Sequence, residues 1–124
     1  MTDRQAALRA ISVGDIFHAE APNGASLICL ALSITETTIR GKAVTTQLYY
    51  DFDRTTGIAE WGDERIPCRI DSVAPLPLDI HETMMSLDRK FSQEDNGDPT
   101  QFWLTDRERR GLFFVADFYP ANPI

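Results

Sequence analysis

The segment Leu27-Ile28-Cys29-Leu30-Ala31-Leu32 decides the fold, because all six of its side chains are apolar. A strand that shows one face to water alternates apolar with polar residues, whereas this run is apolar on both alternating faces. Other parts of the chain must therefore cover both of its faces. We expect a sheet with a core on one side and helices on the other.

Short β-type runs, broken by turn residues, extend from residue 15 to about residue 73. Pro22-Asn23-Gly24 suits a tight hairpin turn, because proline presets the first turn position and glycine takes a positive φ freely. A second turn is expected at 53–57, and Pro75 stops the last run. Besides the strand at 27–32, we expect strands at 15–20, 58–61 and 66–73. The segments 39–44 and 47–53 are expected to form one long strand that bends at Gly41 or Thr45.

Three residue pairs have the spacing of a capping box, in which two side chains satisfy free donors at a helix start. These pairs are Thr2 with Gln5, Asp79 with Glu82, and Thr105 with Glu108. The first predicts a short helix that ends near Ile11. The second opens a helix with one apolar stripe, formed by Ile80, Met84, Leu87 and Phe91. The third opens a helix that is charged over 106–110 and nearly all apolar over 112–119, where we expect it to be buried.

These elements predict an α+β fold in one domain, residues 1–124. The expected parts are a short N-terminal helix within 1–14, a β part over 15–75 and a helical part over 79–119. The β part is a strongly bent antiparallel sheet of about five strands, with two C-terminal helices packed on one face. The strand count and turn spacing fit either a small barrel of the SH3-like kind or an open curled sheet.

The charge and hydropathy of the chain argue against two kinds of partner. The 12 basic and 19 acidic side chains give a formal charge of -7, a field that repels the phosphates of nucleic acid. No segment approaches the ~20 apolar residues of a membrane span, and the N-terminus has no basic start with an apolar run behind it. We therefore expect a cytoplasmic protein that binds no membrane, with Cys29 and Cys68 as buried thiols.

No group of residues predicts catalysis, a metal or a cofactor. His18 and His81 have no second His or Cys four residues away, so neither belongs to a local zinc motif. The serines lack a Gly-x-Ser-x-Gly elbow, and the sequence assigns neither histidine a partner. The prediction is a protein that is not an enzyme and needs no cofactor.

Two carboxylates in the β part could meet. If Asp53 pairs near Ile58 in a hairpin, Asp51 faces Glu60 across it. Facing carboxylates repel, so they need a cation or a shared proton, as in acid–base and metal sites. Arg40 and Lys42 project from the same face of a neighbouring strand. We expect them to neutralise the pair in a solvated network, and a functional carboxylate site is the alternative.

The residues most suited to binding a partner stand near the start of the last helix. Phe102 and Trp103 precede the densest basic cluster, which contains Arg107 and Arg110. Large aromatic side chains beside arginines form typical interface anchors, although Phe102 and Trp103 could instead be core. Tyr49 and Asp51, on the expected outer face of the sheet, are lesser candidates.

These observations favour a non-enzymatic protein-binding or regulatory module whose partner is another protein. One alternative is a small-barrel nucleic-acid-binding protein, which rests on fold analogy alone. Another is an acidic inhibitor that imitates nucleic acid, which would gather its carboxylates on one surface.

Overall fold

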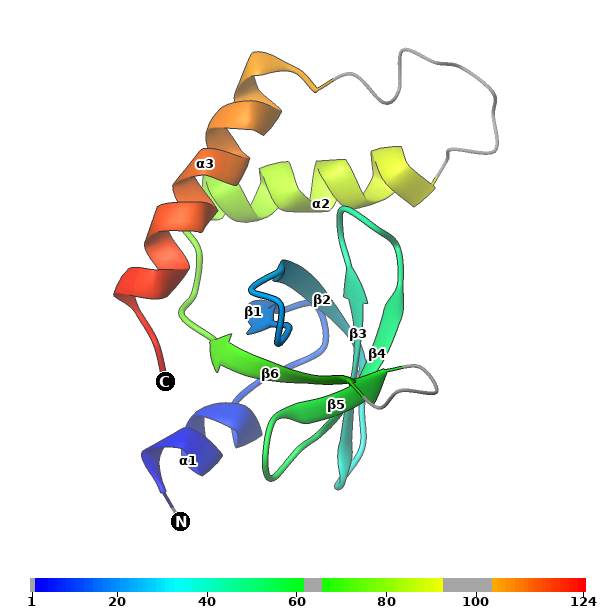
Figure 1. Cartoon of the computed structure of the whole chain (residues 1–124). Helices are drawn as coiled ribbons and strands as arrows, with labels where there is room; N and C mark the ends of the chain where they lie inside the picture. Colours follow the sequence, from blue (N-terminus) through cyan, green and yellow to red (C-terminus); the bar gives the residue numbers. More distant parts are fainter. Residues whose placement is uncertain (1, 62–65, 93–103) are drawn as a thin grey trace.

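The computed structural model describes residues 2–61, 66–92 and 104–124 (Figure 1). A short N-terminal helix precedes a run of strands, and two longer helices follow. In chain order the elements are α1 (Asp3–Arg9), β1 (Ile16–Glu20), β2 (Ser26–Ile34), β3 (Thr38–Ala43), β4 (Tyr49–Asp53), β5 (Ile58–Trp61), β6 (Ile66–Ser72), α2 (Leu78–Ser92) and α3 (Asp106–Ala121).

The strands form one antiparallel sheet in the order β4-β3-β2-β1-β6-β5. Its two edge strands, β4 and β5, lie next to each other, so the sheet curls into a nearly closed barrel. This confirms the predicted α+β fold with a strongly bent sheet and favours the small barrel over the open sheet. In the described part of the chain the sheet has six strands, one more than expected.

The extra strand comes from the segment predicted as one long strand over 39–53. That prediction was wrong, because β3 and β4 are separate strands paired as a hairpin. Gln47 turns the chain between them with a φ of 62°, in the left-handed region. Its backbone N–H donates to the carbonyl of Ala43 at 2.7 Å, and its side-chain amide donates to the carbonyl of Val44 at 2.8 Å.

The two faces of β2 contact two different cores, as its apolar run predicts. Leu27, Cys29 and Ala31 point into the barrel, and Ile28 and Leu30 point outward to the helical layer. The barrel core is completed by Leu8, Ile11, Phe17, Ala19, Ile39, Ala43, Tyr50, Phe52, Ala59, Cys68 and Ile70. The helix-facing core is completed by Ile16, Val44, Met84, Leu87, Val115 and Tyr119.

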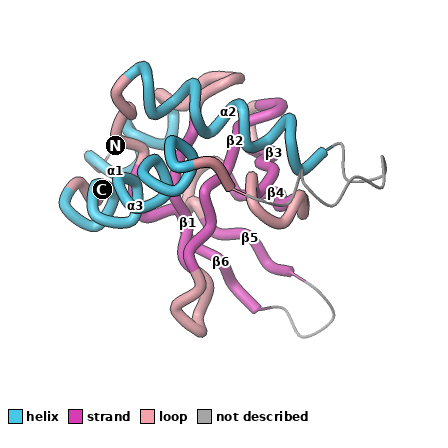
Figure 2. The backbone as a smooth tube through the Cα atoms, turned by 90° about the horizontal axis from the view of Figure 1, so that it is seen from above, coloured by secondary structure: helices cyan, strands magenta, loops and turns pink. Residues whose placement is uncertain are grey.

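Helices α2 and α3 cross each other and cover this outer face of the sheet (Figures 1 and 2). The capping boxes predicted at Thr2 and Thr105 are both present. The one predicted at Asp79 is wrong, because α2 already begins at Leu78. Asp79 lies inside the first turn instead, where its negative charge suits the helix dipole.

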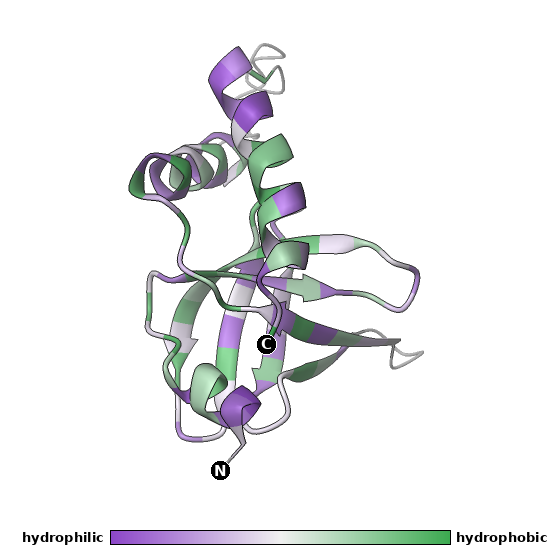
Figure 3. Ribbon diagram, turned by 90° about the vertical axis from the view of Figure 1, so that its left-hand side faces the viewer, coloured by the Kyte–Doolittle hydropathy of each residue, from purple (hydrophilic) through white to green (hydrophobic). Residues whose placement is uncertain are grey.

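Helix α3 buries less of its apolar half than we expected. Figure 3 shows hydrophilic residues at its start and hydrophobic ones further along. Of these, Val115 and Tyr119 are buried, whereas Phe113 is 73% exposed and Phe114 37% exposed. The prediction of burial across 112–119 was therefore wrong. Since α3 packs through one side only, it buries side chains about four residues apart and leaves the opposite side in water.

Candidate functional sites

The outer side of α3 combines arginines with exposed aromatic rings. Arg107, Arg110, Phe113 and Phe114 are all exposed, and their spacings of three and four residues place them along one side of the helix. We call these four residues the α3 surface. The ring of Phe114 stacks on that of Phe118, with centroids 5.4 Å apart and planes 22° apart. This stacking holds Phe114 in place at the edge of the helical core.

The six predicted partner-binding residues do not form one site. Phe102 and Trp103 lie outside the described residues. Tyr49 and Asp51 are exposed on β4, where Arg40 lies 5.1 Å from the Tyr49 ring centroid and 4.0 Å from an Asp51 oxygen. Strand β4 and helix α3 lie on different sides of the molecule (Figures 1 and 2). Of the four candidates that the structure describes, Arg107 and Arg110 belong to the α3 surface, and Tyr49 and Asp51 do not.

The expected Asp51–Glu60 pair does not form across a β-hairpin. Asp51 has Arg40 as its cross-strand partner, whereas Glu60 on β5 is opposite Pro67 on β6. The prediction was wrong because the turn after β4 leads to a strand that pairs with β6, and no ladder joins β4 to β5 in the described chain. Arg40 does contact Asp51, as anticipated for the ion-pair network.

Lys42 was expected to join that network but points to α2 instead. Its Nζ lies 3.0 Å from Oδ1 of Asp88, and both side chains are nearly buried. The side-chain amide of Gln47 donates to the same oxygen at 3.0 Å. These two contacts fasten the β3–β4 hairpin to α2. Their role is structural, because the carboxylate is already paired and shielded from water.

Three polar side chains form a hydrogen-bonded group across β2, β1 and β6. His18 on β1 lies between its two neighbouring strands, with Nδ1 2.5 Å from Oδ1 of Asp71 and with Nε2 hydrogen-bonded to Oγ of Ser26. His18 is only 8% exposed, and its ring lies against the tilted ring of Tyr119 at a centroid distance of 5.2 Å. Ser26 is exposed, so one end of this hydrogen-bonded group reaches water.

This group was not predicted, since no motif in the sequence gives His18 a partner. Ser26 and Asp71 lie 8 and 53 residues away from His18, which is no local motif. The only signal was the alternation of His18 with Ile16 and Glu20, which puts all three on one face of β1. A bulge in β6 between the partners of His18 and Ala19 helps to bring Asp71 beside the ring.

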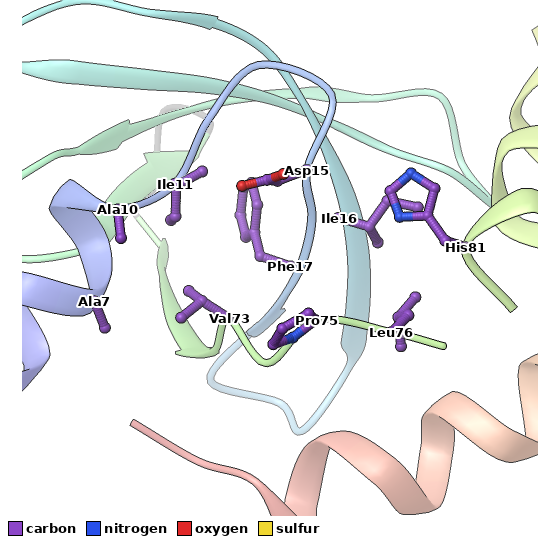
Figure 4. Close-up of a pocket in the computed structure, with 10 residues that line it drawn as sticks. All are labelled: Ala7, Ala10, Ile11, Asp15, Ile16, Phe17, Val73, Pro75, Leu76 and His81. Atoms are coloured by element: carbon purple, nitrogen blue, oxygen red, sulfur yellow. The ribbon is translucent and has the colours of Figure 1, made fainter. Parts of the chain in front are cut away.

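A pocket of about 310 Å³ lies between α1, β1 and the connection from β6 to α2 (Figure 4). Most of its lining is apolar and includes Ile11, Phe17 and Val73, while its ionisable residues are Asp15 and His81. Asp15 accepts a hydrogen bond from the backbone of Ser12 at 2.8 Å through Oδ2. A pocket of this size and lining can hold a small apolar molecule with one polar group.

The two thiols are buried, as predicted. Cys29 is fully buried and Cys68 is 4% exposed, and neither forms a disulfide. Burial raises the pKa of both thiols, and for Cys29 the nearby Cys68 adds to the effect. Both cysteines are therefore inert packing residues at neutral pH.

Comparisons of the chain with protein-family models, with curated proteins and with solved structures found no match. Among the described helices, none has the length and apolarity needed to cross a membrane. Within the same part of the chain, no three His, Cys, Asp or Glu side chains gather in a group that could hold a metal ion.

Proposed function

We propose that this chain is a protein-binding module and that the α3 surface contacts its partner. The observation that carries this proposal is the exposure of Phe113, a large apolar ring with 73% of its surface in water, beside two arginines on the same side of the helix. Aromatic residues and arginines supply most of the binding energy in protein interfaces. Since most of the Phe113 ring lies in water, it contributes little to the stability of the domain and is free to contact a partner.

The charges of the α3 surface indicate the chemistry of the partner. Arg109 donates to Asp106 at 3.3 Å and to the carbonyl of Leu104 at 2.8 Å. In the described part of the chain, neither Arg107 nor Arg110 makes an ion pair, so their guanidinium groups remain available. A matching partner segment presents carboxylates next to apolar side chains. Arginine favours carboxylates because its planar group binds both oxygens at once.

The overall charge of -7 argues against a nucleic acid on this surface. Binding to nucleic acid draws its affinity from many Lys and Arg side chains that displace counterions, and the α3 surface offers two. The nucleic-acid-binding barrel and the acidic inhibitor remain the alternative proposals.

Affinity capture from the native host, followed by binding measurements with the purified partner, tests the proposal. The wild-type chain is compared with Phe113→Ala, Arg107→Ala and Arg110→Ala. Arg89→Ala, at an exposed position on α2, is the matched control. Truncation of an interface anchor costs about 2 kcal/mol or more, so the Kd of Phe113→Ala is expected to rise about 30-fold.

Thermal unfolding separates binding from folding in this experiment. Substitution of exposed residues changes stability by about 0.5 kcal/mol or less, so all four variants should unfold like the wild type. A partner that binds every variant equally well would place the interface elsewhere and overturn the proposal. Salt-sensitive binding of single-stranded RNA or duplex DNA tighter than ~1 μM would favour the nucleic-acid alternative instead.

A further inference from the structure

The side chains of Ser26, His18 and Asp71 are hydrogen-bonded through the same atoms as the three residues of a catalytic triad. In such a triad a serine is the nucleophile, a histidine is its base and a carboxylate orients the histidine. Asp71 meets Nδ1 of His18, and Ser26 meets Nε2. A carboxylate only accepts hydrogen bonds, so the proton of a neutral imidazole sits on Nδ1 and is donated to Asp71. Nε2 then carries a lone pair and accepts the proton of the Ser26 hydroxyl. This is the arrangement that activates a serine for attack.

The surroundings of the group favour that chemistry. The His18 ring is nearly buried, and the Tyr119 ring lies against it with an angle of 32° between the planes. Strands β1, β2 and β6 are neighbours in the sheet, so their backbone ladders fix the positions of all three residues. Ser26 itself is exposed at the start of β2 and can reach a molecule from solution. A buried base and an exposed nucleophile are thus held on a rigid scaffold.

A hollow of about 340 Å³ lies beside the group and has Asp71 in its wall. Glu20, which also lines it, is the cross-strand neighbour of Ser26 on one side and of Arg69 on the other. Pro22, Ile58 and Pro67 supply apolar surface, and Arg69 supplies a cation. The hollow can accommodate a small uncharged acyl group, because the carboxylates of Glu20 and Asp71 line it together with Arg69 and would repel a second carboxylate.

We propose that Ser26, His18 and Asp71 form a nucleophilic site that hydrolyses small carboxylic esters. Ser26 Oγ attacks the carbonyl carbon, and its proton passes to Nε2 of His18. The bond between that carbon and the ester oxygen breaks, and the leaving alkoxide takes the proton from Nε2 to depart as an alcohol. Water then attacks the acyl-Ser26 by the same route, which releases a carboxylic acid and restores the Ser26 hydroxyl. Asp71 is a positioning residue that keeps the base in its reactive tautomer.

This activity is independent of partner binding at the α3 surface, so either proposal can fail without the other. The test uses the full chain, a fluorophosphonate probe and p-nitrophenyl acetate. The probe is expected to label Ser26, identified by mass spectrometry of the modified peptide. Ser33→Ala, which removes another exposed serine of β2, is the matched control and should keep both the labelling and the hydrolysis.

Ser26→Ala is expected to abolish the labelling and to lower ester hydrolysis to the rate of the free imidazole background. Ser26→Ala leaves Nε2 of the buried His18 without its partner, so a modest fall in melting temperature is expected, and circular dichroism checks that the variant is folded at the assay temperature. Asp71→Asn should slow hydrolysis by about 10²- to 10⁴-fold through kcat, with KM nearly unchanged and with an altered pH profile. Probe labelling of Ser26 no greater than that of Ser33, or an unchanged rate in Ser26→Ala, would overturn the proposal and leave His18 a structural residue.

Discussion

Gly111 of α3 lies directly against Thr83 of α2, where the two helices cross. A Cβ atom at Gly111 would stand 3.0 Å from Cγ2 of Thr83 and 3.1 Å from Cε of Met84, closer than ordinary van der Waals contact. The absence of a side chain at this position therefore sets how near the helices approach.

A large side chain at Gly111 should push the helices apart. We expect Gly111→Leu to lower the free energy of unfolding by about 1 to 3 kcal/mol, because overpacking forces side chains and backbone to move. Urea denaturation measures the loss. Ala116→Leu places the same side chain at an exposed position of α3 and should stay within about 0.5 kcal/mol of the wild type. Equal stability of the two variants would show that the crossing tolerates wider spacing.

Leu87 fixes α2 to the outer face of the sheet and is fully buried. Leu87→Ala should cost about 2 to 5 kcal/mol, because the cavity left at a packed site cannot close completely. Reversible denaturation with a denaturant gives the value. The control is Leu78→Ala in the same helix, where the side chain is 74% exposed. A loss below ~1 kcal/mol at Leu87 would mean that α2 is loosely packed.

The hydroxyl of Tyr119 is buried, and no hydrogen-bond partner for it exists among the described residues. A buried polar atom without a partner is destabilising, so Tyr119→Phe should raise the free energy of unfolding by about 1 kcal/mol while keeping the ring in contact with His18. Tyr49→Phe, at an exposed ring, should leave stability unchanged. A clear loss of stability in Tyr119→Phe would reveal a partner for the hydroxyl.

The pKa of Glu108 predicts that the stability of the fold decreases in acid. Burial raises its pKa, but the hydrogen bonds that its carboxylate accepts from the Lys90 ammonium and the Thr105 backbone N–H outweigh this effect and leave the pKa below its usual value. A lowered pKa in the folded state means that the stabilisation is present above the unfolded pKa, about 4.3, and is lost as the pH falls through the folded value. Chemical denaturation as a function of pH should show this decline.

The same measurement on Glu108→Gln should give a flatter curve below about pH 4, since glutamine has no proton to gain. Glu82→Gln, at an exposed position of α2, should decline like the wild type. Parallel curves for Glu108→Gln and the wild type would assign the acid sensitivity to other carboxylates.

The sequence alone determined the features that depend on neighbours along the chain. The capping boxes at Thr2 and Thr105 and the stripe through Met84 and Leu87 follow from helical spacing, and the structure contains all of them. The two-sided burial of 27–32 follows from its composition, since no polar residue was available to face water. The turn at Gln47 escaped prediction, because glutamine rarely takes a positive φ.

Only the tertiary structure decided what comes together from distant parts of the chain. Asp71 reaches His18 across 53 residues because β6 pairs with β1, and the strand order of a sheet is set by the packing of the whole barrel rather than by local preference. The exposure of Phe113 likewise depends on which side of α3 meets α2. Local sequence determines whether each element is a helix or a strand. The free energy of the complete core determines which side of that element is buried and which residues it contacts.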